Sequence, residues 1–545
     1  MAETVHLFLG DHENTLRNTM ADLTDHKVVQ RIWKYDHTLW KDDPKEIANR
    51  LGWLRVAETL RDEADTLKSW AKSIRDEGLT HALLLGIGGS SLASETLHQT
   101  FGSDPEFLTF SVLDSTDPGA VLERAVQIDP AKTLFIVSTK SGDTVETRSF
   151  LNYFYTRTQA QLGRKDVGSH FIAITDGGSS LEALGGKLEF RRIFLNDPDI
   201  GGRYSALSYF GMVPAALMGL DIARLLDSGI RMMNTCEAAD NSAARVGAVL
   251  GRLALSGRDK ATFLFSPEIA SLGDWIEQLI AESSGKEKRV GIIPVVGEPP
   301  GPPEVYGSDR VFVRITVGED GRNEKMDALQ AAGHPVIRIP ITDCHEIGGQ
   351  FFFWEFATVV ACEQLRVNPF DQPHVQTAKT IAREKIEGYR ENRKIPRGNA
   401  LAPDAMALSD FTYQARPGDY IAVQAFVHPT SETDAALAEL RDYLRRMTRL
   451  AVTVGYGPRF LHSTGQLHKG DSGKGLFVQL ISDIPKDDPP IPVEPGSDES
   501  LITFGILKTA QALGDYEALL NADRRAIRFD LGADVPSGIR QLTGG

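Results

Sequence analysis

The sequence is poor in cysteine and carries no excess of positive charge. Its 545 residues include three cysteines, Cys236, Cys344 and Cys362, which lie far apart in the chain. They do not suit a disulfide framework or a paired-cysteine metal site, so a reducing compartment is the simpler interpretation and a cytoplasmic protein is expected. The net charge of −15 disfavours binding to nucleic acid or to an anionic membrane, because neither attracts an acidic protein.

Membrane-spanning and secretory segments are not predicted either. The longest apolar run, about residues 210–220, is shorter than the roughly 20 residues that cross a bilayer. Asp11, Glu13 and Arg17 follow the short segment 1–9 at once, which is unlike a secretory leader. We therefore expect a soluble protein, in which local cations and backbone amides hold any anionic substrate.

Length and patterning predict several domains, about two to four for a chain of this size. Residues 1–75 show helical spacing of apolar residues. Residues 76–235 and 236–400 each alternate short apolar runs with helical stretches, which is typical of parallel α/β sheets. Residues 401–545 follow the order strand, helix, strand, strand, helix, strand, as in ferredoxin-like domains. We predict an α/β protein with two parallel-sheet domains and a C-terminal α+β domain.

A glycine-rich turn, Gly-Ile-Gly-Gly-Ser-Ser at 86–91, follows the first candidate strand, 81–85. With Asp114 downstream it partly matches a dinucleotide-binding fingerprint, but Ser91 replaces the third glycine and the match is weak. Such a turn offers backbone N–H groups and hydroxyl groups at the start of a helix, which suits a phosphate or a sugar hydroxyl. A tight turn without ligand is the alternative. The candidate binding residues here are Gly89 and Ser90.

A second turn, Ser-Thr-Lys-Ser-Gly-Asp-Thr-Val-Glu-Thr at 138–147, lies between another candidate strand and a helix. Hydroxyl groups, a lysine and free amides converge at a helix N-terminus, which favours a phosphomonoester dianion. The pattern of a Walker loop is absent, and a polar turn without ligand is the alternative. The candidate substrate-binding residues of this turn are Ser138, Thr139, Lys140, Ser141, Thr144 and Glu146.

Together with later segments, the two turns resemble the sugar isomerase superfamily, and the glucose-6-phosphate isomerase family in particular. The segments occur in the family's order over residues 80–390. The later ones are Gly-Gly-Arg-Tyr-Ser at 201–205, Ile-Ala-Glu-Ser-Ser-Gly-Lys at 280–286, His-Glu-Ile-Gly at 345–348, and Asn-Pro-Phe-Asp-Gln-Pro at 368–373 followed by Lys379.

The resemblance implies a role for each matching residue. Glu282 corresponds to the base, Arg203 stabilises negative charge on the reacting sugar, His345 and Lys379 open the sugar ring, and Gln372 belongs to the site. It also implies conversion of glucose 6-phosphate and fructose 6-phosphate through a cis-enediol, without a metal or organic cofactor. A homodimer is implied as well, in which the partner subunit donates the histidine.

The spacing of the residues bears on these roles independently. Trp275, Leu279 and Glu282 share one face of a helix, so Glu282 lies on an apolar stripe; a structural ion pair is the alternative to a base. Lys379 lies on the apolar face of its helix, so its ammonium should face the interior, although it could also extend to solvent. His345 precedes a helix and could equally be its cap.

Two features depart from the family's compact members. Asp143 stands in the phosphate turn and would repel an anion unless its carboxylate points away. The long tail makes the chain most similar to the isomerase half of bacterial bifunctional transaldolase/glucose-6-phosphate isomerases, and its polar segment 462–470 could lie near the active-site mouth. Two rival functions are a broader phosphosugar isomerase that also accepts mannose 6-phosphate, and a sugar-phosphate sensor without catalysis.

Overall fold

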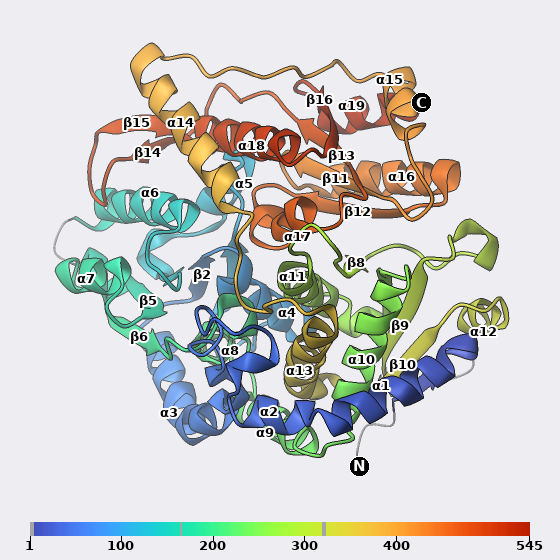
Figure 1. Ribbon diagram of the computed structural model, residues 1–545. Helices are drawn as coiled ribbons and strands as arrows, with labels where there is room; N and C mark the ends of the chain where they lie inside the picture. Colours follow the sequence, from blue (N-terminus) through green and yellow to red (C-terminus); the bar gives the residue numbers. More distant parts are fainter. Residues whose placement is uncertain (1–4, 164–165, 319–322, 545) are drawn as a thin grey trace.

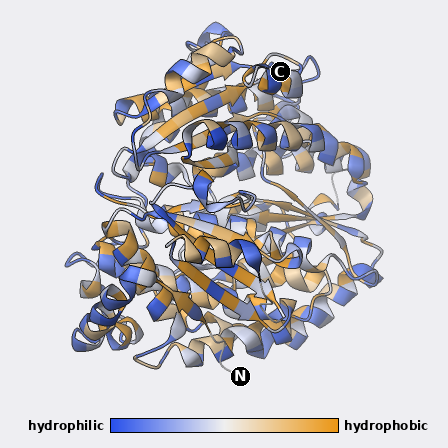
Figure 2. Cartoon of the chain, turned by 90° about the vertical axis from the view of Figure 1, so that its right-hand side faces the viewer, coloured by the Kyte–Doolittle hydropathy of each residue, from blue (hydrophilic) through white to orange (hydrophobic). Residues whose placement is uncertain are grey.

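Three sheets of mainly parallel strands form the framework of the protein (Figure 1). The computed structural model describes residues 5–163, 166–318 and 323–544. In Figure 1 the first two sheets lie side by side in the lower part of the molecule, and the third lies above them. The strands are largely hydrophobic and the helices around them carry hydrophilic outer faces (Figure 2). No helix in the described part of the chain has the length and apolar character needed to cross a membrane.

The first sheet is wholly parallel, with the strand order β3-β2-β4-β5-β6. Helices cover both faces, which explains why its strands are apolar along their whole length. The strands are β2 (His81–Leu85), β3 (Thr109–Leu113), β4 (Thr133–Ser138), β5 (Phe171–Asp176) and β6 (Arg192–Asn196). The helices are α4 (Leu92–Phe101), α5 (Pro118–Gln127), α6 (Val145–Leu162), α7 (Ser180–Lys187) and α8 (Tyr209–Leu217).

The second sheet has the order β1-β10-β9-β7-β8. Its edge strand β1 comes from the N-terminal segment, runs antiparallel and is not expected from the sequence. The strands are β1 (His6–Phe8), β7 (Lys260–Phe265), β8 (Ile293–Val295), β9 (Arg310–Val317) and β10 (Val336–Ile341). The helices are α1 (Glu13–Asp25), α2 (Val28–Trp33), α3 (Val56–Asp76), α9 (Ile222–Thr235), α10 (Ser242–Leu255), α11 (Leu272–Ser284), α12 (Glu324–Ala331) and α13 (Ile347–Leu365).

The third sheet corrects the prediction of a ferredoxin-like C-terminal α+β domain. Its order is β12-β11-β13-β16 and all its pairs are parallel. A ferredoxin-like sheet is antiparallel; here a short helix, α17, lies between β12 and β13 and returns the chain to the start of the sheet. The strands are β11 (Tyr420–Phe426), β12 (Ala451–Tyr456), β13 (Gly475–Ile481) and β16 (Arg525–Asp530), with a separate hairpin of β14 (Pro490–Pro492) and β15 (Ser500–Thr503). The helices are α14 (Gln376–Asn392), α15 (Ala405–Thr412), α16 (Ser431–Thr448), α17 (Gly465–Gly470), α18 (Phe504–Asn521) and α19 (Val535–Gln541).

The C-terminal region shares apolar cores with both other sheets. Leu467 and Phe477 pack in one buried cluster with Ala281 of α11. Phe504 of α18 belongs to a second cluster, in which its ring stacks on that of Phe150 of α6, with centroids 5.9 Å apart. The region therefore closes over the loops that follow the strands of the first sheet, where parallel sheets bind their ligands.

Candidate active site

The turn after β2 contains two glycines that make room for other backbone segments. Gly88 has a φ of +59°, and a Cβ there would lie 2.8 Å from the Cβ of His462. At Gly89, a Cβ would lie 2.3 Å from the carbonyl oxygen of Gly202. These glycines thus allow the C-terminal region and the short 3-10 helix η7 (Gly202–Tyr204) to approach the turn that precedes α4. The close approach of these segments explains why glycine stands at both positions, and a dinucleotide-binding site is not needed to explain it.

The hydroxyl-rich turn after β4 gathers its side chains at the start of α6. The hydroxyl groups of Thr139 and Thr144 are 2.9 Å apart. Ser138 donates to the carbonyl oxygen of Ser90 over 2.8 Å, which joins this turn to the glycine-rich one. Gly142 turns the chain with a φ of +81°. The structure therefore brings the two predicted turns together beside one helix N-terminus, where an anion is favoured.

Lys140 and Asp143, two of the three charged residues of this turn, both point to neighbouring elements. The ammonium of Lys140 forms an ion pair with Asp176 and donates to the carbonyl oxygen of Pro198 at 2.8 Å. Ser180, at the start of α7, donates to the carboxylate of Asp143 over 2.6 Å. Because the Asp143 carboxylate is bound to α7, the repulsion of an anion expected from this residue is reduced.

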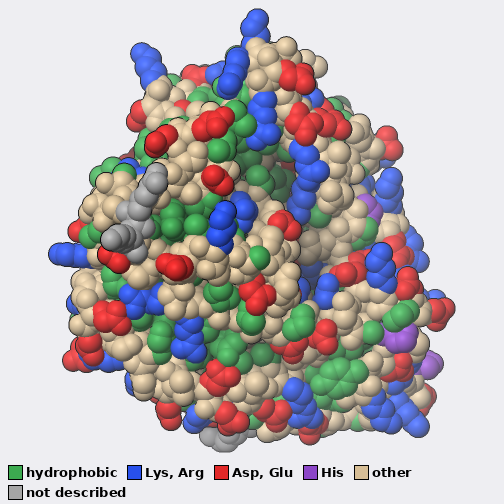
Figure 3. All heavy atoms as spheres, turned by 90° about the vertical axis from the view of Figure 1, so that its left-hand side faces the viewer, with side chains coloured by type: hydrophobic (Ala, Val, Ile, Leu, Met, Phe, Trp, Pro, Cys, Tyr) green, Lys and Arg blue, Asp and Glu red, His purple; other side chains and the backbone are tan. Residues whose placement is uncertain are grey.

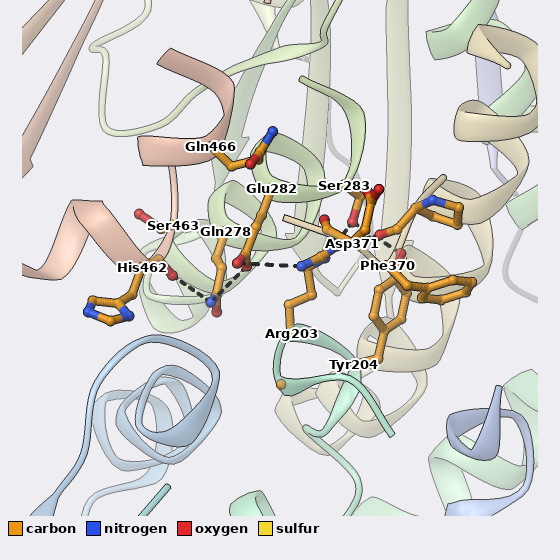
Figure 4. A network of polar contacts seen from close by, with 12 residues as sticks. Arg203, Tyr204, Gln278, Glu282, Ser283, Phe370, Asp371, His462, Ser463 and Gln466 are labelled. Atoms are coloured by element: carbon orange, nitrogen blue, oxygen red, sulfur yellow. Dashed lines mark hydrogen bonds and ion pairs between the residues drawn. The ribbon is translucent and has the colours of Figure 1, made fainter. Parts of the chain in front are cut away.

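Glu282 is buried in α11, with 4% of its surface exposed. Its Oε1 lies 3.4 Å from a terminal nitrogen of Arg203, and its Oε2 accepts a hydrogen bond of 3.2 Å from Gln278. The same Gln278 amide donates to the backbone oxygen of His462 over 2.7 Å. Figure 4 shows the carboxylate held between Gln278 and Arg203. Glu282 is thus positioned through both of its oxygens.

Arg203 is equally fixed. The residue is 3% exposed, and its guanidinium donates to the hydroxyl of Ser283 over 2.8 Å and to the carbonyl oxygen of Pro369 over 2.6 Å. Lys286 binds the neighbouring Asp371 carboxylate at 2.7 Å, and burial lowers the pKa of Lys286 to about 8. The segment 368–373 therefore holds Arg203 in place rather than pointing its own side chains at Glu282.

A histidine of the C-terminal region joins the site, and sequence reasoning does not assign it a role. His462 ends the 3-10 helix η11 (Arg459–His462), and its Nε2 lies 2.9 Å from Oε1 of Glu146. Gln511 of α18 donates to the same oxygen over 2.7 Å. Burial raises the pKa of Glu146, but the charge and hydrogen bond of His462 and the charge of Lys379 outweigh it, so the pKa lies below its ordinary value. The polar segment 462–470 is the sequence signal for this residue.

A cavity of about 200 Å³ lies beside this histidine and is lined by Thr144, Glu146, Lys379 and His462 among others. Figure 3 shows the surface hollowed beneath the C-terminal part, with Lys and Arg side chains along the rim. Lys379 is exposed, so the expectation that its ammonium faces the interior is wrong. The buried side of α14 packs against α18, which leaves Lys379 at the cavity's mouth.

His345 and Gln372 are not brought to Glu282 within the chain. His345 lies in the 3-10 helix η10 (Cys344–Glu346), with its ring 4.9 Å from that of Phe101 and its Nδ1 3.3 Å from Asp343. Phe101 is the last residue of α4, whose ten residues measure about 15 Å, while the opposite end of α4 lies at the site. Gln372 is exposed.

Comparison with known proteins connects this site to a family. Residues 28–294 match the family model of phosphoglucose isomerase. A probable glucose-6-phosphate isomerase of Methanococcus maripaludis is 29% identical over 406 residues, which cover 64% of this chain and 88% of that protein. A glucose-6-phosphate isomerase of Thermus thermophilus is 27% identical over 393 residues, covering 63% and 92%.

Solved structures share the fold. A glucose-6-phosphate isomerase from Chlamydia trachomatis superposes with a TM-score of 0.57 at 16% identity, over 70% of this chain and 87% of that one. A hypothetical protein from Thermus thermophilus gives a TM-score of 0.60 at 23% identity, over 70% and 100%. These likenesses show an α/β fold with several parallel sheets. The chain is similar to the phosphoglucose isomerase family over residues 28–294, just under half of its length. The matched segment contains Arg203 and Glu282 and ends before Lys379 and His462.

Proposed function

We propose that the protein interconverts glucose 6-phosphate and fructose 6-phosphate, with Glu282 as the base. The observation that carries this proposal is the buried Glu282 carboxylate, held by Gln278 and facing the Arg203 guanidinium at 3.4 Å. A carboxylate placed in this way suits removal of a carbon-bound proton, because it is fixed and a cation lies where negative charge develops. A sensor without catalysis would not need this pair.

The phosphate of the substrate binds at the turn of Ser138, Thr139, Ser141 and Thr144. Hydroxyl donors, backbone N–H groups and the N-terminal end of α6 all favour a dianion there. Lys140 neutralises Asp176 beside this turn, so that the region does not repel the phosphate. The sugar then extends from the turn toward Glu282, between the residues that follow β2 and those of the C-terminal region.

Ring opening precedes the isomerisation, and we infer that His462 performs it with Lys379. The imidazole takes the proton from the O1 hydroxyl and supplies a proton to the ring oxygen O5 as the C1–O5 bond breaks. Glu146, at 2.9 Å, stabilises the protonated imidazole between these two transfers. Lys379, at the mouth of the same cavity, is placed to stabilise negative charge on the ring oxygen.

In the open-chain sugar, Glu282 removes the proton at C2 while the carbonyl oxygen at C1 becomes an enediolate oxygen. Arg203 stabilises that negative charge. Transfer of an exchangeable proton between the two oxygens, followed by return of the Glu282 proton to C1, gives the ketose. Every proton that moves in this cycle is supplied by the substrate or by the protein's own residues.

The test of this base is Glu282→Gln, with Glu355→Gln as a matched control. Glu355 is also buried in a helix, and burial raises its pKa well above the ordinary value, which favours the neutral form, so a neutral amide should be tolerated there. In a coupled assay with fructose 6-phosphate we expect Glu282→Gln to lower kcat at least about a hundredfold with a similar KM. Deuterium incorporation from solvent at C2 should be lost with it. Wild-type turnover in Glu282→Gln would contradict the assignment.

A second experiment separates ring opening from proton transfer. We expect His462→Asn to lower kcat/KM for glucose 6-phosphate at least about tenfold, whereas His345→Asn leaves it unchanged. An aldotetrose 4-phosphate cannot close a ring through its phosphorylated hydroxyl, so His462→Asn should isomerise it at the wild-type rate and Glu282→Gln should not. If His345→Asn is inactive and His462→Asn is active, the histidine comes from a partner subunit.

Three finer predictions stay with this proposal. Mannose 6-phosphate as a second substrate is tested in the same coupled assay. The homodimer is tested by the native mass of the purified protein. The likeness to the isomerase half of bifunctional transaldolase/glucose-6-phosphate isomerases implies isomerase activity alone, and a transaldolase assay of the same preparation tests it.

A further inference from the structure

A second, smaller cavity lies within the C-terminal region, apart from the residues that hold Glu282. Its volume is about 50 Å³. It lies between α18 and the strands of the third sheet, and residues 395 and 397 cover it. Its polar lining consists of Arg397, Ser482, Lys508, Thr509 and Arg528. Three of these five side chains are cationic.

Arg528 of β16 is the unusual member of this lining. Its side chain is 1% exposed, yet none of its three guanidinium nitrogens has a hydrogen-bond partner among the described residues. Its carbon Cζ lies 5.7 Å from the ring centre of Tyr516. Burial lowers the pKa of Arg528 to about 10, and the charges of Tyr516, Asp530 and Glu517 offset this effect only in part.

Arg524, four residues earlier, shows how a buried arginine is normally accommodated here. It is 8% exposed, and it donates to the backbone oxygens of His468, Lys469 and Asp471 over 2.8–3.0 Å. A buried charge without such partners is strongly unfavourable. Arg528 therefore requires a partner that the protein itself does not supply.

The other two cations of the cavity are already neutralised. Arg397 forms ion pairs of 2.6 Å with Asp483 and with Asp530. Lys508 binds Asp117 at 2.8 Å. The charge of Arg528 is thus the one left over in the lining, and it calls for a single negative group rather than a polyanion.

We propose that this cavity binds a small oxyanion, such as inorganic phosphate or a short carboxylate, on the guanidinium of Arg528. The planar guanidinium can donate two parallel hydrogen bonds to a pair of oxygens, which is the geometry that phosphate and carboxylate offer. Ser482 adds a hydroxyl group to the same lining. The volume of about 50 Å³ is that of a few water molecules, at about 10–15 Å³ each by the same measure, so one oxyanion fits and a nucleotide does not.

The site also has a direct structural connection to the cavity beside His462. Lys508 and Gln511 lie one turn apart on α18. Gln511 donates to Glu146 over 2.7 Å and accepts from the hydroxyl of Thr116 over 2.7 Å. An anion on Arg528 therefore stabilises the region that presents His462. The inference concerns a separate site and stands independently of the proposed isomerase reaction.

The test measures the thermal unfolding temperature of the full chain against phosphate concentration, with saturating fructose 6-phosphate present to occupy the phosphate turn. A parallel series with acetate, at matched ionic strength, distinguishes the carboxylate source from the phosphate source. We expect one anion to raise the unfolding temperature of the wild type. Arg528→Met should be at least as stable as the wild type without anion and should raise the apparent Kd at least about tenfold, with Arg528→Lys between the two.

Arg524→Met is the matched control. It should lower the unfolding temperature at every anion concentration but keep the anion-dependent increase. The proposal is overturned if the wild type shows no increase with either anion, or if Arg528→Met retains the increase. It is also overturned if Arg528→Met is destabilised as much as Arg524→Met, because Arg528 would then serve the fold alone.

Discussion

Replacing Gly89 with alanine should remove most of the catalytic rate while the protein stays folded. The added Cβ would lie 2.3 Å from the carbonyl carbon and oxygen of Gly202 and 2.9 Å from the backbone nitrogen of Arg203. Ordinary contact begins at 3.4 Å, so the backbone of η7 must retreat by about 1.1 Å, the difference between 3.4 and 2.3 Å. These are backbone atoms, so no side-chain rotation can relieve the overlap.

The retreat changes the position of Arg203 relative to Glu282. The two side chains are 3.4 Å apart, and the guanidinium is tied to Pro369, so a shift of its backbone strains this arrangement. A displacement of about 1 Å in a catalytic group can cost about a hundredfold in rate, whereas overpacking of this kind costs about 1–3 kcal/mol in stability. We therefore expect kcat to fall about a hundredfold with a modest decrease in unfolding temperature.

The assay is steady-state turnover of fructose 6-phosphate beside a thermal unfolding scan. Gly177→Ala is the control, because a Cβ there meets nothing within 4 Å. The affinity for inorganic phosphate should be the same in both variants, since the turn after β4 is not displaced. Full turnover in a folded Gly89→Ala variant would refute the reasoning, because the close approach to Gly202 would then not position Arg203.

Two further predictions follow from charged residues. Lys140→Ala leaves the Asp176 carboxylate uncompensated beside the phosphate turn, so we expect KM for fructose 6-phosphate to rise about tenfold with kcat nearly unchanged; an unchanged KM would contradict the role of this turn. Burial, with the charge of Asp274, raises the pKa of Glu277 to about 8, so the folded state favours the protonated form of this residue. The protein therefore gains stability as the pH falls from about 8 toward the ordinary pKa of a glutamate, and it loses that stability as the pH rises again. Glu277→Gln should therefore lose less unfolding temperature than the wild type between about pH 6 and about pH 9, and parallel losses would show that Glu277 is already ionised at the lower pH.

The two parallel sheets could be predicted because helices cover both faces of each, so every strand appears as a continuous apolar run. The predicted strand 81–85 has the bounds of β2. The edge strand β1 could not be found in this way, because three residues carry too short a pattern and its partner is β10, at residues 336–338. The C-terminal sheet was predicted with the wrong topology, because the six residues of α17 decide between a hairpin and a crossover.

The residues of the candidate site also fall into two groups, those that local sequence patterns predict and those that depend on distant contacts. The helical spacing of Glu282 and the clustered hydroxyl groups at 138–144 are local patterns, and the structure places both as expected. Which histidine reaches Glu146 is not a local property, since His462 lies 316 positions away from it. The direction of the Lys140 side chain likewise depends on Asp176, a residue of another strand.

The contact between Gln511 and Glu146 joins residues 365 positions apart, so it can form only late in the synthesis of the chain. A ribosome adds about 5–20 residues per second, so about 20–70 s pass between the emergence of Glu146 and that of Gln511. Throughout this interval the apolar faces of α6 and α11 that later meet the C-terminal region remain uncovered. The nascent chain thus exposes these apolar faces until its last quarter emerges, and we expect it to be a substrate for chaperones that bind apolar segments.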